Sequence, residues 1–174
     1  MEKRNRQRIR ELTNNIEVIR GVLLKRENEV LSLINPYIRN AEDGTEEDIA
    51  KLIEIRQVML DIQGDHLFRM VTDALKGKET GIAYTTGWVD KETMTKIRAA
   101  VIEYDVRKAV ASEHEDKMVK FVRQYINRRG GSQNMELLNE LIGMLPDCRA
   151  RYNLMASREY LYKCRALQNK DGGT

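Results

Sequence analysis

Apolar residues recur every three or four positions along most of the chain, which is the spacing of helices that pack against other helices. The clearest run is a seam in which only one position is not apolar: Ile9, Leu12, Ile16, Ile19, Leu23, Arg26, Val30, Leu33 and Tyr37. The repeat of about 3.5 residues is typical of coiled coils and helix bundles. We therefore predict a helix over residues 4–34 whose partner is another helix.

Proline, glycine and capping residues set the ends of the predicted helices. The first helix should end at Asn35-Pro36, because the residue before a proline is disfavoured in helical conformation, although Tyr37 and Ile38 can form a further turn. Residues 40–44 are predicted to form a turn. Thr45 then has the properties of an N-cap, and three acidic residues follow it, so a second helix is predicted over residues 46–76.

The second half of the chain contains two more helical patterns. Asp90 is the expected N-cap of a helix over 91–128 that Gly130-Gly131 would end. Its apolar stripe is clear near the start, at Met94, Ile97, Val101 and Tyr104, and near the end, at Met118, Phe121, Val122 and Tyr125. The polar run 112–117 lies within it, where we expect the apolar stripe to change face, the helix to bend, or the helix to project. A fourth helix, over 133–168 with Ser132 or Asn134 as its N-cap, should be kinked or split at Pro146.

These patterns predict an all-α fold. The 174 residues are expected to form a single helical-bundle domain of four long antiparallel helices. Residues 77–90, which are rich in Gly, Thr and aromatic residues, would form a loop between the second and third helices, and residues 169–174 a frayed tail. The low aromatic content of 6% fits this fold better than a β-rich one.

Charge is unevenly distributed, although the net charge is only +3. Basic residues dominate positions 1–26 and acidic residues dominate positions 27–75, so the first helix should pair with the second. Arg26 should then pair with an acid of the second helix or mark the point where the seam reaches solvent. No apolar run is long enough to cross a bilayer, and the N-terminus lacks a signal-peptide core, so we expect a cytoplasmic protein.

The sequence contains no recognisable catalytic constellation. The dinucleotide-binding and nucleophile-elbow glycine motifs are absent, and neither His66 nor His114 follows a glutamate at the spacing that a di-iron bundle requires. We expect His114, which lies in a charged run, to be solvated, and His66 to be a residue of the core boundary or a hydrogen-bonded core residue. Cys148 and Cys164 are too far apart along a helix to form a disulfide and are expected to be free thiols. We therefore predict a protein that is not an enzyme and that needs no cofactor and no metal.

Two segments are candidates for contact with a partner. The aromatic loop is the first, because exposed aromatic residues are enriched at the centres of protein interfaces. Its partner-binding residues would be Tyr84, Trp88, Ile82 and Val89. The alternative is that these four side chains cover the open end of the helical core.

The basic N-terminal arm is the second candidate, because closely spaced cations can neutralise the phosphates of a nucleic acid. Its residues are Lys3, Arg4, Arg6, Arg8 and Arg10, and Arg128 and Arg129 would join them only if the fold brings the two segments together. The alternative is that the arm packs against the acidic second helix or stays solvated.

These candidates lead to two functional hypotheses. The first is a non-enzymatic helical interaction protein (an adaptor, assembly factor, chaperone or structural subunit) that binds a protein partner or itself through helix faces and the 77–90 loop. The alternative is a nucleic-acid-associated protein that binds the phosphate backbone through the basic arm. We expect neither membrane binding nor a small-molecule ligand, although a pocket beside Tyr84 and Trp88 is a third hypothesis.

Overall fold

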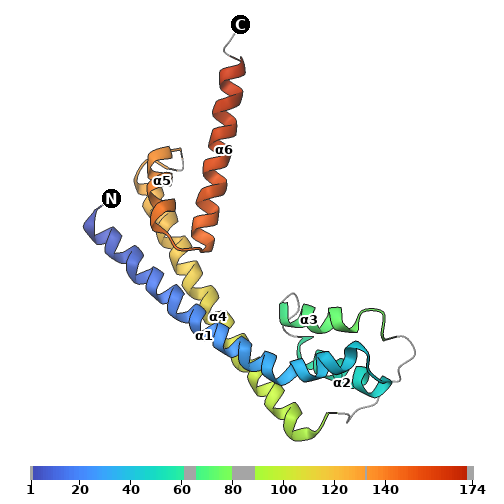
Figure 1. Cartoon of the computed structure of the whole chain (residues 1–174). Coiled ribbons are helices and arrows are strands. Elements are labelled where there is room, and N and C mark those ends of the chain that lie inside the picture. The colour runs from blue at the N-terminus through green and yellow to red at the C-terminus, as the bar shows by residue number, and fades with distance from the viewer. Residues whose placement is uncertain (1, 61–65, 80–88, 132, 172–174) are drawn as a thin grey trace. The chain divides into compact units, whose positions relative to one another are not determined.

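The computed structural model describes residues 2–60, 66–79, 89–131 and 133–171, and within them it contains six helices and no strand. The all-α class is therefore confirmed, but the number of helices differs from the prediction. In chain order the helices are α1 (Lys3–Glu42), α2 (Glu46–Val58), α3 (His66–Leu75), α4 (Lys91–Arg128), α5 (Met135–Met144) and α6 (Arg149–Asp171) (Figure 1). The predicted second helix corresponds to α2 and α3. The predicted fourth is split into α5 and α6 at Pro146, as expected.

The first helix does not end at Pro36, and this part of the prediction was wrong. Helix α1 continues through the proline to Glu42. A proline inside a helix removes one backbone hydrogen bond and clashes with the preceding turn. Ile34 before it and Ala41 after it are both 0% exposed in the same core, so burial of this helical face outweighs the local penalty.

The turn after α1 depends on a glycine. A Cβ atom on Gly44 would lie 2.0 Å from the carbonyl oxygen of Asn40, so only glycine fits there. Thr45 then caps α2 as predicted: its hydroxyl accepts a hydrogen bond from the Asp48 N–H, and the Asp48 carboxylate accepts one from the Thr45 N–H. This reciprocal pair is a capping box.

Three other predicted helix ends in the second half of the chain are also confirmed, whereas α6 continues to Asp171, beyond the predicted end at residue 168. Asp90 accepts a hydrogen bond of 2.8 Å from the Thr93 N–H at the start of α4. At the end of α4, Gly130 and Gly131 have positive φ angles of 99° and 83°, and the Gly131 N–H reaches back to the Ile126 carbonyl. Asn134 caps α5 through the Leu137 N–H.

The chain divides into two compact units, and each has its own hydrophobic core. Unit 1 comprises residues 1–20 and 110–174, and unit 2 comprises residues 21–109. The core of unit 1 is built from the first half of α1, the second half of α4, and α5 and α6. The core of unit 2 is built from the second half of α1, α2, α3 and the first half of α4.

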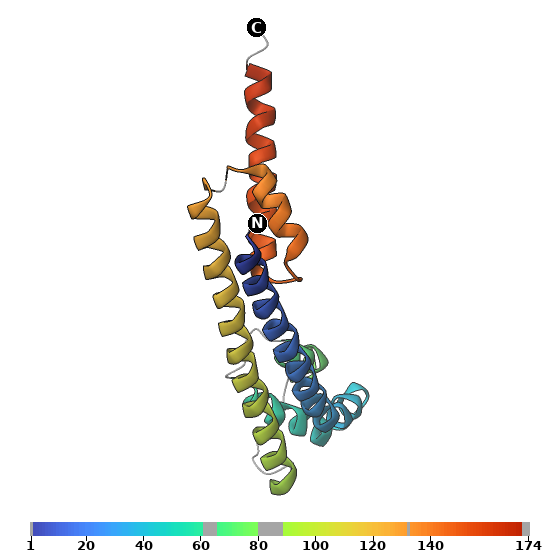
Figure 2. The same ribbon diagram turned by 90° about the vertical axis from the view of Figure 1, so that its left-hand side faces the viewer.

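The long partner of α1 is α4. In each unit a part of α1 and a part of α4 belong to the same core, and in unit 1 the first half of α1 runs beside the second half of α4 (Figure 2). In unit 1 they are antiparallel, because Glu2 pairs with Arg129 at 2.5 Å while Arg20 pairs with Glu115 at 2.8 Å. The charge pattern had favoured the acidic second helix as the partner. Exposed ion pairs contribute only a few tenths of a kcal/mol each, however, so the burial of apolar stripes decides which helices pack.

The buried stripe of α1 departs from the predicted seam in its second half. Ile9, Leu12, Ile16, Ile19 and Val30 are buried as expected, whereas Leu23, Leu33 and Tyr37 are only partly buried. Ile34, one position after Leu33, is fully buried instead. A straight helix has about 3.6 residues per turn, so its buried face drifts away from a 3.5-residue repeat by roughly 20° per heptad.

Arg26 pairs with its own helix rather than with an acid of the predicted second helix. Its guanidinium donates a hydrogen bond of 2.7 Å to Glu29, and this bond raises the pKa of Arg26. The Arg26 side chain is partly exposed, which fits the second expectation, that it marks the point where the seam approaches solvent.

The polar run 112–117 does not interrupt α4, which is one helix from Lys91 to Arg128. Within unit 1 the run provides polar contacts between helices. The Glu115 carboxylate, only 14% exposed, accepts hydrogen bonds from the Arg20 guanidinium and from the Arg149 N–H. The Arg149 side chain also donates to the Ser112 carbonyl oxygen. The run therefore joins α1 and α4 to the first residue of α6.

Two further expectations concern the chain as a whole. No helix in the described part of the chain is long and apolar enough to cross a membrane. Cys148 and Cys164 are both free, as the helical spacing predicted.

Candidate functional site

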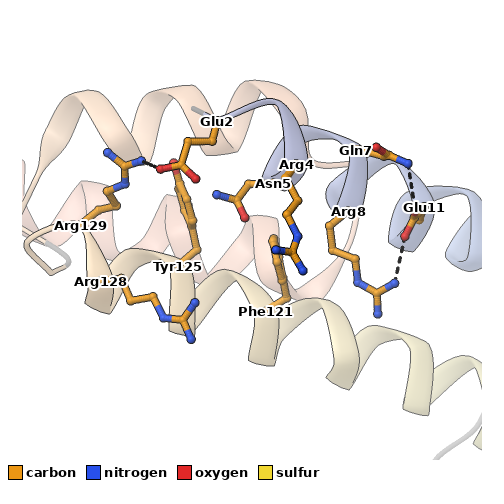
Figure 3. A pocket seen from close by; sticks show the side chains of 10 residues that line it. All are labelled: Glu2, Arg4, Asn5, Gln7, Arg8, Glu11, Phe121, Tyr125, Arg128 and Arg129. Carbon is orange, nitrogen blue, oxygen red and sulfur yellow. Dashed lines mark hydrogen bonds and ion pairs between the residues drawn. The ribbon is translucent and has the colours of Figure 1, made fainter.

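A groove of about 910 Å³ lies in unit 1, between the first turns of α1 and the last turns of α4. Figure 3 shows its side chains, which come from both helices, from Glu2 just before α1 and from Arg129 just after α4. The lining residues are Glu2, Arg4, Asn5, Gln7, Arg8, Glu11, Phe121, Tyr125, Arg128 and Arg129. Four of these ten residues are arginines and two are aromatic, so the groove is both basic and suited to contact with a planar group.

Helical geometry explains which cations of the basic arm reach the groove. Arg4 and Arg8 are one turn apart, on one flank of the stripe that buries Ile9 and Leu12. Figure 3 shows both arginine side chains extending from α1 toward α4. Arg6 and Arg10 lie on the opposite flank of the stripe, because each residue advances by about 100° around a helix.

Helix α4 provides a row of planar side chains. Phe121, Tyr125 and Arg129 are four residues apart and therefore share one face of the helix. The Phe121 and Tyr125 rings are stacked, with centroids 6.5 Å apart and an angle of 11° between their planes. The Arg129 guanidinium lies 5.8 Å from the centroid of the Tyr125 ring, which is a cation–π contact.

The groove holds an excess of positive charge. Arg8 pairs with Glu11 at 3.0 Å and Arg129 pairs with Glu2 at 2.5 Å, so the two carboxylates each offset one arginine. Over the parts of the chain that the structure describes, Arg4 and Arg128 pair with no carboxylate. The N-terminus of α1 adds a partial positive charge. The groove is therefore equipped to bind an anion.

Arg128 and Arg129 were expected to join the basic N-terminal arm only if the fold brought the two segments together, and it does. Both residues line the same groove as Arg4 and Arg8, although they come from distant parts of the chain. The other three predicted cations, Lys3, Arg6 and Arg10, do not line it. Arg6 instead forms an ion pair of 3.4 Å with Glu140 on α5. The arm is thus divided between the groove and the α5 side of α1.

Phe121 and Tyr125 belong to the groove but were assigned only to the core stripe of the third predicted helix. Their four-residue spacing from each other and from Arg129 is visible in the sequence. Which flank of that stripe remains open to solvent depends on the position of α1, and the sequence pattern does not encode it directly.

The predicted aromatic partner site lies almost entirely outside the described residues. Ile82, Tyr84 and Trp88 are not described, so their role stays a prediction. Val89 is buried in the core of unit 2, and its N–H donates a hydrogen bond of 3.0 Å to the Glu54 carboxylate.

A second hollow, of about 630 Å³, lies between α4 and α6 in unit 1. Its lining mixes core residues (Val122, Ile126 and Leu154) with polar side chains, and among the lining residues only Arg123 is charged. It lacks the paired cations of the first groove, so we regard the first groove as the candidate functional site.

The remaining reactive side chains of the described chain lie elsewhere. Cys148 is 1% exposed, and burial raises the pKa of its thiol, which leaves it in the poorly nucleophilic protonated form. His66 is partly exposed at the core boundary, as expected, and its Nε2 atom contacts the Glu27 carboxylate. His114 was expected to be solvated, but its Nδ1 atom is buried without a hydrogen-bond partner among the described residues.

Comparison of the chain with known family models, with curated proteins and with solved structures finds no match.

Proposed function

We propose that this is a non-enzymatic protein that binds nucleic acid through the groove between α1 and α4. The observation that carries the proposal is the meeting of Arg4 and Arg8 with Arg128 and Arg129 at one surface. Clustered arginines bind phosphate groups through charge-assisted hydrogen bonds and release condensed counterions from the nucleic acid backbone. The contacts are to the backbone, so we expect little dependence on base sequence.

The first hypothesis from the sequence, binding of a protein partner through the 77–90 loop, stays a prediction. The residues that would carry it, Tyr84 and Trp88, are not described. The groove instead offers defined geometry: two arginines that have no carboxylate partner in the described part of the chain, two more held by single ion pairs, and a helix N-terminus. For this reason we favour phosphate binding at the groove over binding of a protein at the loop.

An electrophoretic mobility shift assay tests the proposal at about 50 mM salt, where phosphate contacts are strongest. The wild-type chain should bind a short oligonucleotide. The variant Arg4→Glu with Arg128→Glu should lose most of this affinity, because it replaces with carboxylates the two groove arginines that have no carboxylate partner among the described residues. The dependence of log Kd on log salt should also become shallower, by about 1.4 for two lost contacts to a single strand.

The matched control is the variant Arg69→Glu with Arg98→Glu. It makes the same change in net charge at two exposed arginines of unit 2. The control should retain most of the wild-type affinity. Equal losses in the two variants would mean that binding follows net charge rather than the groove. Absence of binding by the wild-type chain at about 50 mM salt would remove the proposal.

A further inference from the structure

The two aromatic residues of the groove are not equally available to a ligand. Tyr125 is 7% exposed, and the guanidinium of Arg129 lies over its ring. Phe121 is only partly buried and stands at the other end of the row, one helical turn closer to the middle of α4. Phe121 is therefore the ring against which a planar ligand group can stack.

The surroundings of Phe121 match the parts of a nucleotide. Arg4 and Arg8 extend from α1 on the side of the groove that faces Phe121, where they can bind phosphates (Figure 3). Asn5 and Gln7 add side-chain amides, which both donate and accept hydrogen bonds and so suit the edges of bases. Cations combined with a stacking ring are the elements from which proteins build sites for single strands.

We propose that the groove recognises single-stranded nucleic acid, with one unpaired base stacked on Phe121 and the flanking phosphates bound by Arg4 and Arg128. In a duplex both faces of each internal base are covered by its neighbours, so no base is free to stack on the ring. The inference rests on the proposed function, because it names the class of nucleic acid that the same groove binds.

The test compares two single-stranded ligands that differ only in their bases. One is a fluorescein-labelled oligothymidylate of about 12 nucleotides, and the other is an abasic phosphodiester of the same length. Both carry the same backbone charge. The wild-type chain should bind the oligothymidylate more tightly by roughly 5- to 150-fold, which is the range for stacking of one base on an aromatic side chain. Fluorescence anisotropy titrations measure both affinities.

Two variants assign this preference to Phe121. Phe121→Leu keeps an apolar side chain against the core but removes the ring, so affinity for the oligothymidylate should fall to the abasic level while abasic affinity stays unchanged. Phe121→Tyr keeps the ring and should keep the preference. A purely structural role would lower the affinity for both ligands together and would not depend on the ring.

The possible outcomes separate the two proposals. If the wild-type chain binds neither ligand, the proposed function itself fails. If it binds both equally, the groove takes phosphates alone, and stacking on Phe121 is wrong while the proposed function stands. Tighter binding to a duplex of the same length than to the oligothymidylate would also overturn the inference. A preference for bases that survives in Phe121→Leu would place the stacking site elsewhere.

Discussion

At the scale of single residues, a few side chains determine where the helices begin. Thr45 and Asp48 form a reciprocal pair at the start of α2, and Asp90 accepts hydrogen bonds from Thr93 at the start of α4. These contacts involve residues three positions apart, so short sequence patterns were enough to predict them. They also make two aspartates more stable in the charged form.

The capping aspartates should make stability depend on acid. The Thr45 hydroxyl and N–H lower the pKa of Asp48, and the Thr93 side chain and N–H lower that of Asp90, in both cases below the ordinary value of 3.8. A carboxyl whose pKa is lower in the folded state stabilises the fold above its unfolded pKa and loses this effect as the pH falls through the folded pKa.

The variant Asp48→Asn with Asp90→Asn should therefore lose less stability than the wild type when the pH falls from about 5 to about 3. Asparagine accepts the same capping hydrogen bonds but does not titrate. Urea unfolding at the two pH values measures the difference. The control, Asp43→Asn with Asp73→Asn, removes the same number of carboxylates at exposed positions outside the caps and should follow the wild type. Equal losses in all three proteins would contradict this prediction.

Charged residues away from the caps were harder to place from the sequence. Of the two expectations for Arg26, pairing with an acid of the second predicted helix was wrong, because it pairs with Glu29 three positions away, while its partial exposure fits the other expectation. His114 was expected to be solvated, yet its Nδ1 atom is buried. Such positions depend on which helix covers them, and that is decided by tertiary packing rather than by neighbours in the sequence.

At the scale of helices, α1 shows where a local rule is overridden. Proline was predicted to end the helix, and this rule describes backbone sterics correctly. It does not include the apolar residues on the far side of Pro36, which join the core of unit 2 and keep the chain helical to Glu42. By contrast, Pro146 lies where α5 has already ended, and there the prediction of a break is confirmed.

The effect of each proline on the free energy of unfolding can be measured by replacing it with alanine. Pro36 is exposed, so Pro36→Ala removes no buried contact and restores a backbone N–H that can bond to the Ser32 carbonyl. The free energy of unfolding should rise by roughly 1–3 kcal/mol, since a proline within a helix costs about 3 kcal/mol relative to alanine. Pro146→Ala is the control and should give no such gain, because Leu145 before it is extended. If Pro36→Ala were no more stable than the wild type, Pro36 would not impose the expected cost on α1.

At the scale of the whole chain, two cores are built along the same two long helices. The sequence predicted one domain, and its first seam correctly included buried residues such as Ile9, Leu12 and Val30 but missed Ile34 and Ala41. It did not indicate that the buried residues fall into two clusters, one made with α5 and α6 and the other with α2 and α3. The groove belongs to unit 1, so its arginines depend on the core of that unit.

Two matched core substitutions test whether the two units unfold independently of each other. Leu52 in unit 2 and Leu138 in unit 1 are both 0% exposed, and replacing either with alanine should cost about 2–5 kcal/mol. If each core is a separate cooperative unit, Leu138→Ala should accelerate amide hydrogen exchange in α5 and in residues 9–19 of α1 but leave α2 near its wild-type rates. Leu52→Ala should do the reverse, accelerating exchange in α2, α3 and residues 30–41.

The same pair of variants connects stability with binding. Leu52→Ala should leave oligonucleotide affinity close to that of the wild type, because the groove is built entirely from unit 1. Leu138→Ala should weaken binding, since Leu138 shares a core with Ile9, Val122 and Tyr125, which hold the two walls of the groove in place. If both variants instead accelerated exchange equally in all helices, the two clusters would form one cooperative core, and the single domain predicted from the sequence would be the better description.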